Sequence, residues 1–412
     1  MIGFLRDNLR WLLAGILLTF CSCFGQTFFV SVFAGEIMAS FELSHGDWGA
    51  LYTVSTMAAA VVMLCIGGLT DRFRIRTLGP AVLAMLAITC LGMAFAREVV
   101  WLGVVIFGLR LFGQGLSTHL ATVSMARWFS ARRGMALSVA RFGYLIGEAA
   151  LPLLIVAAMA IWPWQTLWFV PAAVALLAIP VLRRALLEER TPQSLAKSSE
   201  SVGMLGRHWT RRETLGHYLF WAMILAQLGP PAFNTAFFFQ QVHYAEVKGF
   251  THVQIVALFP FFTGAGVVAM LGAGWAVDRF GAARTIVWSL LPAALGFACF
   301  AFGPTLGWTL LGMILLASTS GAASTLPGAF WAEFYGTRHI GAIKSMASAL
   351  MVFGSAIGPG LTGGLIDAGV GIEAQYAGIA VYFLLATALM GWGLRRALPD
   401  LAVAPEVDVV RP

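Results

Sequence analysis

The chain has 412 residues, of which 59% are hydrophobic and only 11% are charged, with a formal net charge of +7 at pH 7. Soluble domains are roughly 45–50% apolar and about 25% charged, because their surfaces face water. This composition excludes a water-soluble protein and predicts a membrane protein. The positive charge lies in short segments between long apolar runs, so it does not indicate nucleic-acid binding.

Twelve apolar runs in the chain are long enough to cross a membrane. A helix needs roughly 20 mostly apolar residues to span ~30 Å of hydrocarbon, where only a helix or a closed barrel satisfies the backbone. The first run follows Arg6 and Arg10 but has too long an apolar core for a signal peptide, so we interpret it as a retained helix. We expect an all-α membrane protein with twelve transmembrane helices, called helix 1 to helix 12 in chain order, at 11–33, 46–69, 77–96, 99–126, 136–159, 162–182, 216–240, 252–275, 283–303, 306–330, 343–367 and 375–396.

Basic residues are distributed unevenly between alternate loops. One set of loops holds Arg72, Arg74, Arg76, Arg127, Arg132, Arg133, the arginines from Arg183 to Arg212, Arg279, Arg284 and Arg338, whereas the other set holds Arg97 and Lys248. Loops rich in lysine and arginine stay on the cytoplasmic side of a membrane. We therefore expect both termini in the cytoplasm, in a monomeric multi-pass protein of the bacterial inner membrane.

The chain repeats itself at an offset of 207 residues. The triplet Asp71-Arg72-Phe73 recurs as Asp278-Arg279-Phe280, and in the same register Gly134 aligns with Gly341 and Pro152 with Pro359. An even number of spans per copy gives both copies the same orientation in the bilayer. We predict an N-terminal six-helix bundle at 1–182, a cytoplasmic linker at 183–215, a C-terminal six-helix bundle at 216–396 and a cytoplasmic tail at 397–412.

These features resemble the major facilitator superfamily of secondary transporters over essentially the whole chain. The segment from Gly67 through Asp71 and Arg72 is similar to the family's loop signature between helices 2 and 3, and the segment from Gly274 through Asp278 and Arg279 is similar to its second copy. The first copy has Arg74 where the pattern has glycine, and the second copy keeps Gly281.

The resemblance implies two six-helix bundles that alternate between two states, with these loop residues as a conformational latch. Asp71 would face the N-terminus of helix 11 near Gly341, and Asp278 the N-terminus of helix 5 near Gly134, where the partial positive charge of a helix end attracts a carboxylate. The loop arginines have an alternative explanation as topology anchors.

Ionisable side chains inside the spans are the candidate site residues, because a charge at membrane depth is costly unless it is paired or wetted. Arg110 lies twenty residues before the loop near residue 130, and Glu148 lies eighteen residues after it. At ~1.5 Å per residue both are near the midplane, as an ion pair or as two parts of one substrate and proton site. His119 and Arg141 lie level with each other, each eleven residues from that loop.

Arg141, Tyr144 and Glu148 share one face of helix 5 by their spacing. We predict a polar stripe between helices 4 and 5 made of Arg110, Gln114, His119, Arg141, Tyr144 and Glu148. The alternative is a buried network that only holds these two helices together. Neutral polar groups extend the candidate substrate set to Gln26 in the first run and to Gln227 and Asn234 around the Pro230-Pro231 break in helix 7.

The leading hypothesis is a secondary transporter that carries a small organic anion, a carboxylate, with Glu148 or His119 coupling protons. It loosely resembles the monocarboxylate and oxalate/formate branch. The alternative is a drug/proton antiporter that exports amphipathic or cationic compounds and uses Glu148 as an exchangeable counter-charge. The chain has no phosphate-binding GxxxxGK[ST] loop, no HExxH and no paired CxxC, so we expect no enzyme activity, cofactor or metal.

Overall fold

The computed structural model describes residues 2–66, 69–129, 133–188 and 202–401. Within these residues the backbone forms helices joined by turns and short loops, without a strand. The expected all-α class is confirmed. Each predicted apolar run coincides with helical structure, because a backbone without water must satisfy its hydrogen bonds internally.

Long helices and short helical turns follow one another along both halves of the chain. The first half contains α1 (Ile2–Asp7), α2 (Leu9–Ser22), η1 (Cys23–Gly25), α3 (Thr27–Val30), η2 (Ser31–Phe33), α4 (Ala34–Phe41), α5 (His45–Ile66), α6 (Leu69–Arg72), α7 (Ile75–Ala94), α8 (Val99–Gly108), the π-helix η3 (Leu109–Ser117), α9 (Thr118–Trp128), α10 (Arg133–Met159), α11 (Trp164–Leu167) and α12 (Phe169–Ala185). The second half contains η5 (Met204–Gly206), α13 (Arg211–Leu215), α14 (Tyr218–Gln227), α15 (Gly229–Phe239), α16 (Gln241–Lys248), α17 (His252–Val256), α18 (Phe259–Phe280), α19 (Ala282–Ile286), η6 (Val287–Leu290), α20 (Leu291–Phe302), α21 (Leu306–Ala323), α22 (Leu326–Tyr335), α23 (Ile340–Asp367) and α24 (Ile372–Leu401).

Among the described residues, nine helices are long and apolar enough to cross a membrane. A tenth is formed by Leu9–Gly25 and Thr27–Phe41, which are bent by 49° at Gln26. Helix α5 and the α14–α15 pair coincide with the two remaining predicted spans. The structure supports a multi-pass membrane protein, and the count of twelve crossings stays a prediction.

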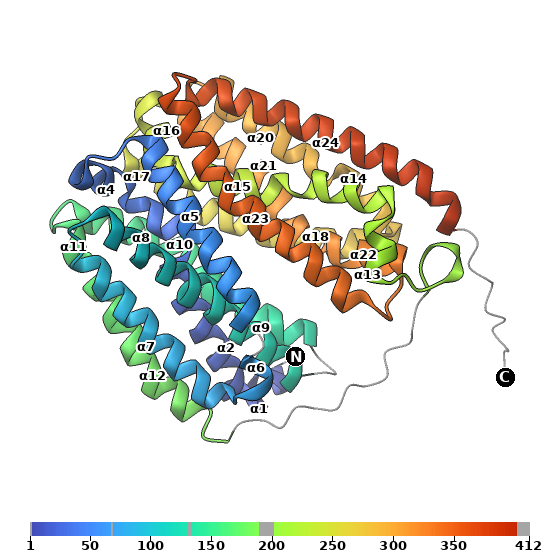
Figure 1. Cartoon of the computed structure of the whole chain (residues 1–412), viewed down its shortest axis with the longest axis horizontal. Coiled ribbons are helices and arrows are strands. Elements are labelled where there is room, and N and C mark those ends of the chain that lie inside the picture. The colour runs from blue at the N-terminus through green and yellow to red at the C-terminus, as the bar shows by residue number, and fades with distance from the viewer. Residues whose placement is uncertain (1, 67–68, 130–132, 189–201, 402–412) are drawn as a thin grey trace. The chain divides into compact units, whose positions relative to one another are not determined.

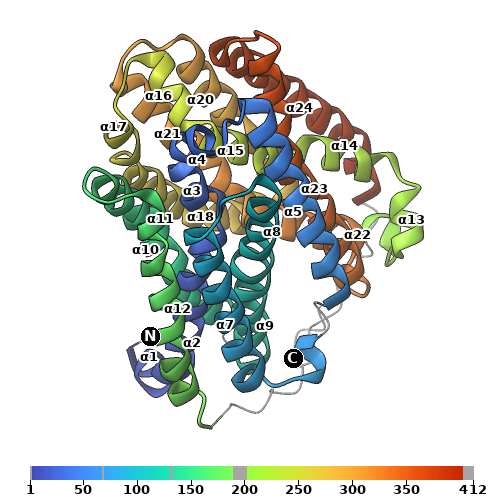
Figure 2. The ribbon, with the colours of Figure 1, turned by 60° about the vertical axis from the view of Figure 1, so that its left-hand side comes forward.

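The chain forms two compact units, and the first consists of Met1–Lys197, Thr235–Pro260 and Ala356–Gly369. Within it α2 packs against α10, α9 and α12, and α7 lies along α12 (Figures 1 and 2). Helices α2 and α10 are in backbone contact, because a Cβ on Gly143 would lie 2.0 Å from the carbonyl oxygen of Ile16. Small residues allow this close approach between helices in a membrane.

The second unit consists of Ser198–Asn234, Phe261–Ser355 and Val370–Pro412. Its long helix α24 lies along α20 and α14 (Figure 1). Helices α20 and α21 approach closely where Gly296 faces Gly312, because a Cβ on Gly296 would lie 2.8 Å from the carbonyl oxygen of Gly312. The predicted division of the chain at 183–215 stays a prediction, because these units are defined by packing and include segments from several parts of the sequence.

The first unit therefore contains two segments that are distant in sequence from its other helices. Residues 235–260 carry the end of α15 with α16 and α17, and residues 356–369 carry the end of α23. The ring of Phe239 stacks on Trp48 of α5, and Nε2 of Gln241 donates to the hydroxyl of Ser31 in the bent first span at 2.9 Å. Contacts of this kind join the two segments to the unit.

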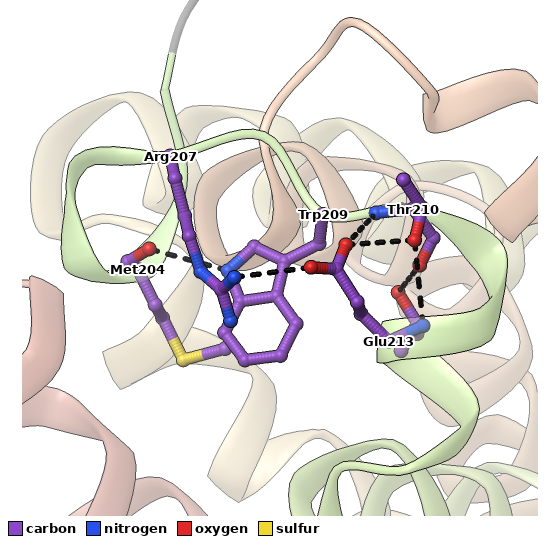
Figure 3. A network of polar contacts seen from close by, with 6 residues as sticks. Met204, Arg207, Trp209, Thr210 and Glu213 are labelled. Carbon is purple, nitrogen blue, oxygen red and sulfur yellow. Dashed lines mark hydrogen bonds and ion pairs between the residues drawn. The ribbon is translucent and has the colours of Figure 1, made fainter.

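The chain enters the second unit through an ordered segment that precedes α13 (Figure 3). The indole Nε1 of Trp209 donates to the carbonyl oxygen of Met204 at 3.2 Å, and the guanidinium of Arg207 lies 4.4 Å from the Trp209 ring centroid. Thr210 and Glu213 form a reciprocal capping box at the start of α13, and Arg207 pairs with Glu213 at 3.0 Å. These contacts fix the start of α13, which lies within the segment predicted as a linker.

Candidate functional site

The first span is broken at Gln26, and the break frees backbone groups inside the membrane. Gln26 has extended backbone angles, φ −81° and ψ 151°, between η1 and α3. A carbonyl released by such a break needs another donor, because water is scarce at this depth. Nη1 of Arg110 donates to the carbonyl oxygen of Gly25 at 3.1 Å. Arg110 therefore supplies the donor for the carbonyl group that the break releases. It also carries the charge that the sequence predicts near the midplane.

The fourth span, formed by α8, η3 and α9, contains the π-helix η3 opposite this break. A π-helix has one more residue in each hydrogen-bonded turn than an α-helix and is frequent at functional sites. The backbones of Gly25 and Gly113 meet here, because a Cβ on Gly113 would lie 2.8 Å from the Cα of Gly25. A Cβ on Gly25 would in turn lie 2.0 Å from the carbonyl oxygen of Leu109. These two glycines allow Arg110 to reach the broken span.

Arg110 is buried, with 3% of its surface exposed. Its Nη1 also lies 3.3 Å from the hydroxyl oxygen of Thr27, and its guanidinium lies 5.1 Å from the ring centroid of Tyr52. Its Nε has no hydrogen-bond partner among the residues that the structure describes. A buried donor left without a partner costs about 1–3 kcal/mol, so this edge of the guanidinium is suited to a ligand that accepts hydrogen bonds.

Helix α10 places a second polar group beside the broken span. The Tyr144 hydroxyl donates to Oε1 of Glu148 at 2.9 Å, and Glu148 is buried with 6% of its surface exposed. The Tyr144 ring packs edge-on against Phe28 of α3, with centroids 5.7 Å apart. The broken span thus lies between Arg110 of η3 and the Tyr144–Glu148 pair of α10.

We call this arrangement the helix 1 site and define it by Thr27, Tyr52, Arg110, Tyr144 and Glu148. It combines the buried guanidinium of Arg110, whose Nε donor is unused, with the buried carboxyl group of Glu148, which accepts a hydrogen bond from the Tyr144 phenol. Such a set can bind an anion and can take up or release a proton. Among the described residues, no group of three or more His, Cys, Asp or Glu side chains is placed to hold a metal ion.

The other residues of the predicted stripe occupy different surroundings. Arg141 is exposed, with its guanidinium 5.8 Å from the Tyr144 ring centroid. Gln26 and Gln114 are half-buried at the break and in the π-helix facing it. His119 Nε2 lies 3.5 Å from the hydroxyl of Thr70, which follows helix 2. The structure therefore gathers Arg110, Tyr144 and Glu148 at the helix 1 site and places His119 beside Thr70.

Gln227 and Asn234 lie in the second unit, on either side of a break in helix 7. Helix α14 ends at Gln227 and α15 begins at Gly229. The Tyr382 hydroxyl donates to the carbonyl oxygen of Leu225, which the break releases. Nε2 of Gln227 and Oδ1 of Asn234 are buried without a hydrogen-bond partner among the described residues. These amides remain candidates for substrate contacts.

The two copies of the predicted latch are described to different extents. Gly67 and the side chains of Asp71 and Arg72 lie outside the described residues. In the second copy Gly274 lies within α18, and Asp278 and Arg279 are exposed near its end. Their role as a latch stays a prediction.

The backbone explains the difference between the two loop motifs. Gly281 has φ 81° and ψ 159° before α19, a conformation that a side chain would strain. Arg74, at the equivalent place before α7, has φ −70° and ψ 146°. Glu333 Oε2 also accepts from the backbone N–H of Ala282 at 2.9 Å and so caps α19.

Sequence analysis missed Thr27, Tyr52 and Glu333. Thr27 and Tyr52 look like ordinary residues of apolar runs, and their roles depend on the break at Gln26. A Gly-Gln pair in the middle of the first run is the one local signal that an interruption was present. Nothing near Glu333 in the sequence indicates that it caps a helix about fifty residues away.

A family model described as the Major Facilitator Superfamily matches residues 15–343 and, in a second match that overlaps the first, residues 261–409. Curated protein sequences include no significant match to the chain.

Solved structures share the fold at low sequence identity. One is a bacterial homologue of the human lysosomal transporter Spinster, in an inward-facing and unoccupied conformation, with a TM-score of 0.73, 16% identity, and coverage of 95% of this chain and 98% of that chain. Another is the nucleoside transporter NupG, with a TM-score of 0.69, 14% identity, and the same coverage of 95% and 98%.

Proposed function

Because this chain belongs to the Major Facilitator Superfamily, we propose that it carries small carboxylates across the membrane by alternating access, together with protons. The chain is a multi-pass membrane transporter of a small solute and not an enzyme. The proposal concerns which solute it carries and which ion it couples. The single observation that carries it is the buried Arg110, whose Nε lacks a partner among the described residues.

An arginine presents planar donors that match a carboxylate, and hydrogen bonds between ionised groups are the stronger class. Arg110 already uses Nη1 for Gly25 and Thr27, so its Nε edge is the part left for a solute. A small carboxylate held there would lie among the side chains of the broken span. This chemistry agrees with the loose resemblance to monocarboxylate and oxalate/formate carriers.

Glu148 supplies the proton in this proposal. An anion on Arg110 adds a negative charge to a site that already holds a carboxyl group, and two negative charges in a medium of low dielectric repel each other strongly. Protonation of Glu148 removes that repulsion, so the anion and a proton bind together more readily than the anion alone. Tyr144 holds the carboxyl group in place for this exchange. The result is symport of one carboxylate with a proton.

The transport cycle in this proposal uses the predicted architecture. Two six-helix bundles rock about the site, and the loops containing Asp71 and Asp278 stabilise one state. We place both termini in the cytoplasm and the protein in a bacterial inner membrane as a monomer, on the distribution of basic loops. Gln227 and Asn234 would contribute solute contacts from the second half.

A buried carboxyl group also favours a second candidate function, the export of cationic compounds in exchange for protons. Glu148 accepts a hydrogen bond from Tyr144, whose ring packs against that of Phe28, and a carboxyl group next to aromatic rings is a setting that accepts cations. In that case a cationic substrate would compete with the proton for Glu148. Arg110 would then only donate its hydrogen bond to the Gly25 carbonyl at the break in helix 1.

Uptake into proteoliposomes separates the two functions. The panel contains formate, acetate, lactate, oxalate and a cationic dye, each tested with and without an inward proton gradient. We expect carboxylate uptake that the gradient stimulates, that Arg110→Ala abolishes, and that Glu148→Gln uncouples from the gradient. Arg97→Ala and Glu36→Gln, both at exposed positions, are the matched controls. Carboxylate uptake that survives both site substitutions would contradict the proposal, and gradient-driven dye export would support the alternative.

A further inference from the structure

An aromatic cluster joins the helix 1 site to segments from the second half of the sequence. The rings of Trp48 and Phe239 stack with centroids 5.4 Å apart and planes 17° apart, and the Tyr52 ring lies 4.8 Å from that of Phe239. All three side chains are at most 1% exposed. Phe239 ends α15, whereas Trp48 and Tyr52 lie one turn apart on α5. We call this cluster the aromatic closure.

Polar bonds support the aromatic closure on both sides. The Thr53 hydroxyl donates to the carbonyl oxygen of Ala356 at 2.7 Å and accepts from the N–H of Gly360 at 3.1 Å. At the start of α5, Oδ2 of Asp367 accepts from the Ser44 hydroxyl and from the N–H of Gly46. These bonds join residues some 300 positions apart within one compact unit, so they must break if α5 and α23 separate during transport.

Tyr52 belongs both to the aromatic closure and to the helix 1 site. Its hydroxyl donates to the Thr27 hydroxyl at 2.8 Å, and its ring lies 5.1 Å from the guanidinium of Arg110. Arg110 donates to the same Thr27 oxygen at 3.3 Å. One side of the tyrosine therefore contacts the proposed anion-binding group and the other contacts Phe239.

We propose that Tyr52 is a positioning residue that couples anion binding at Arg110 to opening of the aromatic closure. The inference rests on the proposed function in one respect, namely that an anion binds Arg110. A carboxylate attracts the guanidinium more strongly than a hydroxyl or an aromatic face does. When Arg110 turns toward the anion, Thr27 and the Tyr52 ring lose a partner, and the contact of the ring with Phe239 weakens. The coupling is reciprocal, so a closed cluster weakens anion binding by the same factor.

The test measures opening directly, with spin labels at the exposed positions Ala39 and Glu246. Both are changed to cysteine in a background with Cys65→Ser, because Cys65 is the exposed cysteine and the other four are buried. The fraction of long inter-label distances reports the open state. Tyr52→Phe keeps the ring and removes the hydroxyl. Tyr244→Phe, at a buried tyrosine of α16 in the same unit, is the matched control.

The first arm uses no anion and is a double-mutant cycle. Arg110→Met and Tyr52→Phe should each raise the open fraction, and the double variant should raise it no further than the larger single effect, because both changes act through Thr27 and the Tyr52 ring. If the effects of Arg110→Met and Tyr52→Phe on the open fraction were independent, so that the double variant combined both in full, the coupling between Arg110 and Tyr52 would be refuted. Unfolding midpoints of all variants identify any that are misfolded, and in that case Arg110→Lys replaces Arg110→Met in the cycle.

The second arm adds lactate or oxalate. Wild type and Tyr244→Phe should show a rise in the open fraction of about 5-fold or more, a coupling of ordinary size, and Tyr52→Phe should lose most of that rise. In uptake assays Tyr52→Phe should lower turnover more than it changes KM. An equal response in Tyr52→Phe and wild type would refute the coupling. Wild type that ignores both anions, with the cycle still non-additive, would refute the anion assignment and leave the Tyr52 link supported.

Discussion

Replacing Gly25 with alanine should destabilise the protein more than any ordinary substitution in a span. The new Cβ would lie 2.0 Å from the carbonyl oxygen of Leu109 and 2.7 Å from the backbone nitrogen of Gln114, and atoms in proteins essentially never approach a Cβ closer than 3.0 Å. Both obstacles are backbone atoms, which no rotamer change can move. The broken span must therefore retreat from η3 by at least 1 Å.

That displacement has two costs. Forcing extra atoms into a packed interior costs about 1–3 kcal/mol. A shift of this size also breaks the 3.1 Å bond from Arg110 to Gly25, and a bond from a charged group is worth about 1.5–3 kcal/mol. Together the expected loss is roughly 2.5–6 kcal/mol.

Thermal unfolding of the purified protein in detergent measures this loss. We expect the midpoint of Gly25→Ala to fall by roughly 5–15 °C. Gly264→Ala is the matched control, because Gly264 lies on α18 with no atom within 4 Å of its added Cβ. It should leave the midpoint unchanged or raise it slightly, since alanine favours helix by about 1 kcal/mol over glycine. Equal midpoints for the two variants would refute the close approach of the broken span and η3.

Three further outcomes are expected. Tyr144→Phe removes the hydrogen bond to Glu148, so the pH profile of uptake should shift while the unfolding midpoint changes little. An unchanged pH profile would argue against proton coupling through Tyr144 and Glu148. Gly281→Ala should lower the free energy of unfolding by about 1–2 kcal/mol, because Gly281 has a positive φ, whereas Arg74→Ala should leave it unchanged. Thermal unfolding measures both variants, and equal effects would contradict the difference in backbone conformation between Gly281 and Arg74. Burial and the neighbouring His45 lower the pKa of His243 in the closed state, so protonation of His243 below pH 6.5, about the ordinary pKa of histidine, should favour the open state. Distances between the spin labels at positions 39 and 246 should therefore lengthen at pH 5.5 in wild type but not in His243→Gln. Equal distances in wild type and His243→Gln would exclude a contribution from His243.

The sequence predicted the positions of the helices well, because hydrophobic length is a strong constraint in a membrane. The run expected at 77–96 is helix α7 (Ile75–Ala94), and the run expected at 136–159 is helix α10 (Arg133–Met159). Apolar length does not report on the hydrogen-bond pattern within a run. For that reason the break at Gln26 and the π-helix η3 were not expected, and the break in helix 7, expected at Pro230-Pro231, lies after Gln227.

For the candidate site, the sequence predicts the depth of the side chains in the membrane but not the direction in which they point. Counting residues from a loop placed Arg110 and Glu148 near one level, and the structure buries both beside the broken span. The same count placed His119 level with Arg141, but equal depth does not specify the face of a helix. His119 lies beside Thr70 and Arg141 is exposed. Contacts such as that of Tyr52 with Phe239 depend on the packing of distant segments, which no local pattern in the sequence records.

The central claim is that Arg110 and Glu148 form one site where a carboxylate and a proton bind together. Proton uptake on solute binding tests it most directly, measured with a pH indicator in weakly buffered detergent solution as lactate or oxalate is added to the purified protein. We expect about one proton to be taken up per anion bound in wild type, binding without proton uptake in Glu148→Gln, and no binding in Arg110→Ala. Anion binding with undiminished proton uptake in both variants would contradict it.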